Sequence, residues 1–153
     1  MPVTLEQVIE QLGKEEPDYE FAARLGTDAL PHLLRLVQET DRQNPGYAAK
    51  AACLASFIDA DESAAILRIA ARSPDPALRA SAAASLANLK RFLPDVASSL
   101  IKDEDAGIRK WVLNALSIHI PSGFKADVEE MSRTDPDVKI RQLAKQVTDR
   151  IKN

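Results

Sequence analysis

The sequence is poor in the residues on which many active sites depend. It has one cysteine, two histidines, one tryptophan and five glycines among 153 residues. The single cysteine, Cys53, excludes an intramolecular disulfide and fits a reducing compartment. The histidines and the cysteine lack zinc-site spacing, and the scattered glycines form no phosphate-binding loop. We therefore expect no metal ion, no cofactor and no catalytic residue.

Charge and hydropathy narrow the class of protein further. Twenty basic and 23 acidic residues give a net charge of −3, which argues against a nucleic-acid partner. No apolar run approaches the roughly 20 residues that span a bilayer, so no membrane role is expected. The first residues lack the basic start and apolar stretch of a signal peptide. The sequence thus predicts a cytoplasmic protein, with an aliphatic core because aromatic residues make up only 5%.

A pattern that recurs every thirty residues is the strongest signal in the chain. An aspartate, then an aliphatic residue and then a basic residue occur together three times, as Asp75, Leu78 and Arg79, as Asp105, Ile108 and Arg109, and as Asp135, Val138 and Lys139. A degenerate earlier copy at 51–55 matches 83–87 at an offset of 32. Such regularity indicates a repeat protein, in which each unit buries its apolar face against its neighbours.

Each unit is expected to contain two helices separated by a turn. Proline ends one helix, and Asp75 is a natural N-cap for the next, with Pro76 in its first position. We predict about ten helices in five pairs and no strand, at 3–12, 18–25, 28–40, 46–58, 62–72, 76–91, 94–103, 106–119, 124–134 and 137–151. For the helix 62–72, the predicted buried face consists of Ala65, Ile66, Ile69 and Ala70.

The repeated signature, followed by small residues and a leucine, resembles the HEAT repeat, in particular the short bacterial type also found in phycobilisome lyases. The resemblance covers roughly 28–151. It implies an all-α protein, a right-handed α–α superhelix of about five helix pairs. We predict a single HEAT-like domain over 1–153, with an N-terminal capping pair at 1–27 and repeats at 28–60, 61–91, 92–121 and 122–153.

The recurring charged positions are typically structural in HEAT-like proteins. A catalytic residue has no reason to recur in every repeat, whereas N-caps and salt bridges between repeats do. The sequence therefore predicts a structural ladder formed by Asp75, Arg79, Asp105, Arg109, Asp135 and Lys139.

Two chemically versatile residues fall on structural positions of the repeat. Cys53 takes the place of Ser85 and Ala115, which are small core residues, so we expect a buried and unreactive thiol. His119 aligns with Leu89, which favours a satisfied core or helix-end histidine over a ligand or a general base.

Trp111 departs from the repeat pattern. It aligns with polar residues of the neighbouring repeats, and its helical phase places it away from buried Ile108 and Val112. In HEAT repeats the second helices line the concave face, which would put Trp111 in a groove. The alternative is that Trp111 packs over the next repeat. The predicted partner-binding residues are Trp111, Asn114, Ile118, Ser81, Asn88 and Arg141.

The sequence favours a non-enzymatic protein–protein interaction module, such as an adaptor, an inhibitor or an immunity-type scaffold. It would bind another protein or a peptide on its concave face. The alternative is a HEAT-like enzyme, either a bilin lyase or a DNA-glycosylase-like nucleic-acid binder, which would need a basic groove with aromatic residues. We expect the chain to be monomeric on its own, because its C-terminal helix is polar like a solenoid cap.

Overall fold

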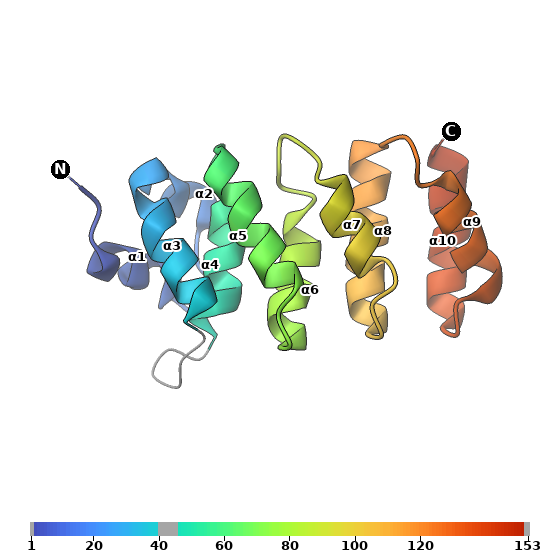
Figure 1. Ribbon diagram of the computed structural model, residues 1–153, viewed down its shortest axis with the longest axis horizontal. Coiled ribbons are helices and arrows are strands. Elements are labelled where there is room, and N and C mark those ends of the chain that lie inside the picture. The colour runs from blue at the N-terminus through green and yellow to red at the C-terminus, as the bar shows by residue number, and fades with distance from the viewer. Residues whose placement is uncertain (1, 40–45, 152–153) are drawn as a thin grey trace.

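The computed structural model describes residues 2–39 and 46–151, and the regular structure in these ranges is entirely helical. Ten α-helices follow one another along the long axis (Figure 1). They are α1 (Leu5–Leu12), α2 (Tyr19–Ala22), α3 (Leu30–Gln38), α4 (Tyr47–Ser56), α5 (Asp61–Ala71), α6 (Pro76–Ser85), α7 (Pro94–Leu100), α8 (Ala106–His119), α9 (Lys125–Thr134) and α10 (Val138–Arg150). Two short 3-10 helices, Ala23–Leu25 and Thr27–Ala29, connect α2 to α3.

From α3 onward the helices form two rows. The first helices of the pairs, α3, α5, α7 and α9, lie in front of the second helices, α4, α6, α8 and α10 (Figure 1). Each second helix contacts the next one in its row, and each packs against the first helix of its own pair. The chain is therefore a helical solenoid, as the sequence predicted, with its core between the two rows.

The core between the rows is aliphatic. Leu54, Leu67, Leu86 and Leu113 are fully buried, and small side chains occupy the remaining space. Alanines at 82 and 83 on α6 are also fully buried, and their small volume allows α6 to pack closely between α4 and α8. Burying each leucine contributes about 2 kcal/mol, so the core between the two rows stabilises the stack without large aromatic residues.

The buried face of α5 lies about one residue away from its predicted position. Ile66 and Ala70 are buried as expected, but Ala65 and Ile69 are exposed. Leu67 and Ala71 are buried in their place. The reason is that α5 contacts α3 and α7 on its two sides as well as α4 and α6 beneath it. Its buried arc is therefore set by four neighbours, which an apolar pattern in one helix does not specify.

The last copy of the repeated turn lies two residues later than the sequence alignment placed it. The N-cap of α10 is Asp137, whose carboxylate accepts hydrogen bonds from the backbone N–H groups of Lys139 and Ile140. Asp105 caps α8 in the same way, and Asp75 caps α6. The repeat pattern predicted Asp135 as this cap, and that prediction is wrong. Residues 135 and 137 are both aspartates, so the pattern fits either position.

The shift changes which residues of α10 match the earlier repeats. α9 has ten residues whereas α7 has seven, so the spacing between the last two copies of the turn is 32 rather than thirty. The equivalent of Arg79 and Arg109 is therefore Arg141, not the predicted Lys139. Lys139 is an exposed residue in the first turn of α10 and has no place in the ladder.

The N-terminal segment is attached to the stack by side chains of α3 and α4. The Lys50 ammonium on α4 donates to the carbonyl oxygens of Leu12 and Lys14, each at 3.0 Å. The Leu12 carbonyl is in the last turn of α1 and the Lys14 carbonyl lies just beyond it. Carbonyl groups at the end of a helix have no partner within the helix and need another donor. The Nε2 atom of His32 on α3 lies 2.7 Å from the carbonyl oxygen of Val3, and His32 is half-buried.

Cys53 lies between Tyr19 of α2 and Ser85 of α6 and is half-buried, so it is less enclosed than predicted. Burial raises the pKa of the Cys53 thiol, although the neighbouring hydroxyl groups of Ser85 and Tyr19 oppose the shift. Burial also raises the pKa of Tyr19 to about 12, with Cys53 as a further cause. The thiolate is the nucleophilic form, and a raised pKa keeps its population low at neutral pH.

We therefore expect slow reaction of Cys53 with an aromatic disulfide reagent in the folded protein at pH 7.5. Unfolding in guanidinium chloride should speed the reaction by at least about tenfold, because the thiol then has its ordinary pKa and full access. Free cysteine measured under the same conditions provides the reference rate. Stoichiometric labelling of the folded protein at the reference rate would contradict the expectation.

Candidate partner-binding surface

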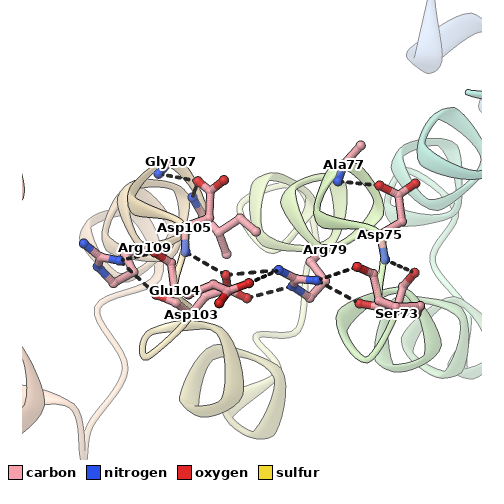
Figure 2. Close-up of polar contacts among 11 residues, drawn as sticks. Ser73, Asp75, Ala77, Arg79, Asp103, Glu104, Asp105, Gly107 and Arg109 are labelled. Atoms are coloured by element: carbon pink, nitrogen blue, oxygen red, sulfur yellow. Dashed lines mark hydrogen bonds and ion pairs between the residues drawn. The ribbon is translucent and has the colours of Figure 1, made fainter.

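An arginine at the start of α6 connects its repeat to the next one. Arg79 Nε donates to the carboxylate of Asp103 at 2.9 Å, and Nη1 donates to the carbonyl oxygens of Ser73 and Pro74 (Figure 2). These two carbonyls lie in the turn between α5 and α6, so one side chain binds the turn of its own pair and a carboxylate of the following pair. The Arg79 and Asp103 side chains are only 14% and 8% exposed.

Arg109 at the start of α8 repeats this arrangement one unit further along. Its Nε and Nη2 atoms bind the two oxygens of Asp135 at 2.8 and 2.9 Å, and Nη1 donates to the carbonyl oxygens of Asp103 and Glu104. The Arg109 and Asp135 side chains are 10% and 3% exposed, so this pair is enclosed. A two-point arginine–carboxylate pair is strong and fixes the relative orientation of the repeats.

The carboxylates that bind the ladder arginines are Asp103 and Asp135. The sequence analysis placed Asp135 in the ladder, but it named Asp105 rather than Asp103, and Asp75 and Asp105 are N-caps. Burial alone would raise the pKa of Asp135, but hydrogen bonds from Arg109 and from the backbone N–H of Asp137 outweigh it and lower that pKa. The pKa of Asp103 is lowered in the same way, against its burial, by Arg79 and a backbone N–H. The signal in the sequence was the Asp-x-Asp spacing at 103–105 and 135–137.

The outer face of α8 carries large apolar side chains that the fold leaves exposed. Trp111 is 45% exposed and Ile118, seven residues later, is 55% exposed. Asn114 lies between them in the sequence and is half-buried. Residues spaced by three and four lie on one side of a helix, so these three form one strip, which we call the α8 strip. Trp111 is neither enclosed nor fully free, so part of its ring packs on the protein.

The side chains of two other predicted binding residues, Ser81 and Asn88, bind within the stack. Ser81 Oγ donates to the carbonyl oxygen of Ala49, and Asn88 Nδ2 donates to Ser56 Oγ. Both bonds connect the second helices of adjacent repeats, which gives these residues a structural role. Arg141 lies in the ladder register, and Leu143 takes its place as the equivalent of Trp111.

The end of α8 holds a further exposed apolar residue that the sequence analysis did not single out. Ile120 is 47% exposed and has a φ of 48°, in the left-handed region. Glycine usually occupies this position after a helix, and a β-branched residue there is strained. The signal was an isoleucine directly before Pro121, where the chain must leave the helix. Strain of this kind often coincides with a functional surface.

A groove of about 340 Å³ runs beside the α8 strip, between α8 and α10. Gly107 and Lys110 of α8 line one wall, and Lys139 and half-buried Leu143 of α10 contribute to the other. Lys110 directly precedes Trp111 in the chain. The lining thus combines apolar Ile140 and Leu143 with the ammonium groups of Lys110 and Lys139, and Asp137, the N-cap of α10, also contributes to it.

A larger pocket of about 660 Å³ lies between the α4–α5 turn and the segment after α6. Its lining includes Asp59, Asp61, Arg68 and Lys90, and the Lys90 ammonium lies 3.7 Å from the Asp59 carboxylate. Carboxylates and cations are mixed along the wall, so it does not select a ligand of one charge.

His119 makes structural contacts at the end of α8. His119 Nε2 lies 2.9 Å from the carbonyl oxygen of Leu86, and its ring packs on Phe92 at 5.3 Å between centroids. It is thus a half-buried, satisfied histidine near the end of α8. Within residues 2–39 and 46–151, no cluster of three or more His, Cys, Asp or Glu side chains could hold a metal ion. No helix of these ranges is long and apolar enough to cross a membrane.

Comparison with known families agrees with the geometry. The family model for HEAT repeats matches residues 63–147, which is more than half of the chain. The protein therefore belongs to the HEAT-repeat family. No curated protein and no solved structure matches the sequence. HEAT repeats generally mediate protein–protein interaction, and HEAT scaffolds are generally non-catalytic.

Proposed function

We propose that this protein is a non-enzymatic interaction module that binds a partner protein or peptide through the α8 strip and the adjacent groove. The observation that carries the proposal is the exposure of Trp111 and Ile118 on one face of a helix. Large apolar side chains left in water contribute little to folding, whereas burying a tryptophan under a partner contributes about 2 kcal/mol or more. Ile120, directly after α8, is a further exposed apolar side chain near the end of the strip's helix.

The groove indicates the kind of partner. An amphipathic helix or an extended peptide could place apolar side chains against Trp111, Ile118 and Leu143. Acidic side chains beside them would meet Lys110 and Lys139 at the groove edges. Such a module fits a cytoplasmic adaptor, inhibitor or immunity-type protein of a bacterium, with the second-helix row as a concave binding face. The bilin-lyase and DNA-glycosylase alternatives gain no supporting observation from the described residues.

We expect Trp111→Ala to weaken partner binding by at least tenfold, about 1.4 kcal/mol, while lowering the free energy of unfolding by less than about 1 kcal/mol. The partner would first be captured from the native cell extract with the wild-type protein, and binding of the purified pair then measured by calorimetry. Ile69→Ser is the matched control, because Ile69 is a similarly exposed apolar residue on α5. Equal affinity of the wild type and the Trp111 variant would refute the assignment.

Fluorescence offers a test before a partner is known, because Trp111 is the only tryptophan in the chain. Partial exposure predicts a red-shifted emission maximum that acrylamide quenches readily. A blue-shifted maximum resistant to acrylamide would mean that the ring is packed, and the α8 strip would lose its anchor.

A further inference from the structure

Two neighbouring second helices present the same pair of side chains on their outer faces. Helix α8 carries Trp111 and, three residues later, Asn114, and α10 carries Leu143 and Gln146 at the same spacing. The two pairs are 32 residues apart, which is also the separation between the N-caps of these helices. The pairs therefore occupy equivalent positions, so a large apolar side chain and a carboxamide recur from one helix to the next.

The polar groups of these pairs are unused within the part of the chain that the structure describes. Gln142 and Gln146 line the groove between α8 and α10, yet their amide groups neither donate nor accept a hydrogen bond there. The same is true of the half-buried side chain of Asn114 and of the indole N–H of Trp111. Asparagine is a poorer helix former than alanine, which occupies the equivalent position 84 on α6, and no side-chain bond offsets that cost.

A bound segment in an extended conformation can use these groups, whereas a helix cannot. The backbone N–H and C=O groups of a helix are bonded within the helix, but a polyproline II segment has no internal hydrogen bonds. A carboxamide carries both a donor and an acceptor, so it can bind the backbone of such a segment. The unused carboxamides of Asn114 and Gln146 therefore favour an extended segment over an amphipathic helix.

The separation of the two pairs matches the repeat of a polyproline II segment. Helix α8 contacts α10 directly, and the axes of packed helices lie about 8–10 Å apart. Polyproline II has three residues per turn and rises about 3.1 Å per residue, so every third side chain returns to the same side after about 9 Å. A segment that crosses both helices can thus place side chains three residues apart against Trp111 and Leu143. A β-strand would direct such side chains to opposite faces.

The charges beside the pairs indicate acidic residues in the segment. Lys110 directly precedes Trp111, and Lys139 lies four residues before Leu143. Both lysines line the groove, and no described carboxylate forms a salt bridge with either of them. Asp137 in the same lining accepts hydrogen bonds from the backbone N–H groups that begin α10, so the helix N-terminus partly balances its charge.

We propose that the partner bound at the α8 strip is an acidic segment in polyproline II conformation that crosses α8 and α10. Prolines or other apolar residues three positions apart contact Trp111 and Leu143. The carboxamides of Asn114 and Gln146 bind the backbone of the segment, and acidic residues between the apolar ones meet the two lysines of the groove. This inference rests on the proposed function, because it takes the α8 strip as the binding surface, and it adds the conformation and chemistry of the partner.

Two display libraries, panned in parallel on the immobilised full chain, test the proposal. One displays short random peptides with proline fixed at two positions three residues apart, which prevents helix formation between them. The other displays the same mixture of random residues on the outer face of a stable helical scaffold. We expect enrichment from the proline library, with acidic residues between the prolines. Enrichment from the helical library alone, or from neither library, would overturn the proposal.

A selected proline peptide is then synthesised, and its affinity is measured by fluorescence anisotropy. Trp111→Ala should weaken binding by at least about tenfold, and Asn114→Ala and Gln146→Ala by at least about fivefold each. N-methylation of the peptide, one residue at a time, should weaken binding at two positions three residues apart, because each methyl group removes a donor to a carboxamide oxygen. Gln38→Ala removes an exposed carboxamide from α3 and should leave the affinity unchanged.

The outcomes separate this inference from the proposed function. Weaker peptide binding by Trp111→Ala, without any effect of the two carboxamide variants or of N-methylation, would keep the binding surface and reject the extended backbone contacts. Peptide binding that survives Trp111→Ala would reject the α8 strip, and this inference with it. Alanine is a better helix former than asparagine or glutamine, so both carboxamide variants should remain folded, which thermal unfolding checks.

Discussion

Arg109→Ala is expected to lower the free energy of unfolding by about 3 kcal/mol, because it leaves a buried carboxylate without its partner. Asp135 is 3% exposed and both of its oxygens bind Arg109. The substitution also removes the donor for the carbonyl oxygens of Asp103 and Glu104. Urea unfolding monitored by circular dichroism measures the change, and partner binding through the α8 strip should persist while the variant is folded.

Arg68→Ala is the matched control for this prediction. The Arg68–Asp95 pair has a similar Nε–oxygen distance of 2.8 Å, but its side chains are 44% and 53% exposed. Water therefore solvates both partners when the pair is broken, and the expected loss is less than about 1 kcal/mol. Adding Asp135→Asn to Arg109→Ala should recover part of the larger loss by removing the unpaired charge. Equal losses for Arg109→Ala and Arg68→Ala would contradict a buried ladder.

Acid should destabilise this protein through the two ladder carboxylates. The pKa values of Asp103 and Asp135 in the folded state lie below the ordinary value of 3.8. As the pH falls, the unfolded chain therefore takes up protons at these positions before the folded protein does. The stabilisation that they provide is complete well above pH 3.8 and is lost as the pH falls from about 4 through the folded-state pKa values.

Thermal unfolding between pH 2 and pH 7 measures this effect. The double variant Asp103→Asn/Asp135→Asn should be less stable than the wild type at pH 7 and should show a flatter dependence on pH below about 4. Asp149→Asn, at an exposed position of α10, is the control and should keep the slope of the wild type. The prediction is wrong if the double variant keeps the full slope, and other carboxylates would then account for the acid lability.

The repeat architecture was predictable because the same sequence pattern occurs independently in several repeats. Asp75 with Pro76 sets the start of α6, and Asp105 sets the start of α8. The same short pattern returned often enough to give the order of the helices. The repeat alignment placed the N-cap wrongly at α10, because both Asp135 and Asp137 fit the aspartate position of the repeat. Deciding between them requires knowing which aspartate faces Arg109, and that is a contact between residues 26 apart.

The candidate binding surface was partly predictable for a similar reason. The helical phase of α8 indicated that Trp111 points away from the core but left open that it packs over the next repeat. Trp111 and Ile118 are both exposed. The bonds of Ser81 and Asn88 to the preceding repeat are not encoded in the pattern of their own helix. Neither is the groove beside Lys110, because it forms only where α10 packs next to α8.

The sequence by itself determined the helical class, the number and order of the helices and the outward phase of α8, since these follow from local periodicity, caps and repeated turns. Only the tertiary structure decided which carboxylate each arginine binds and which face of α5 is buried. It also decided that Arg141, not Lys139, matches Arg79 and Arg109. These features depend on how one repeat is placed on the next, and that placement is set by packing between segments about thirty residues apart.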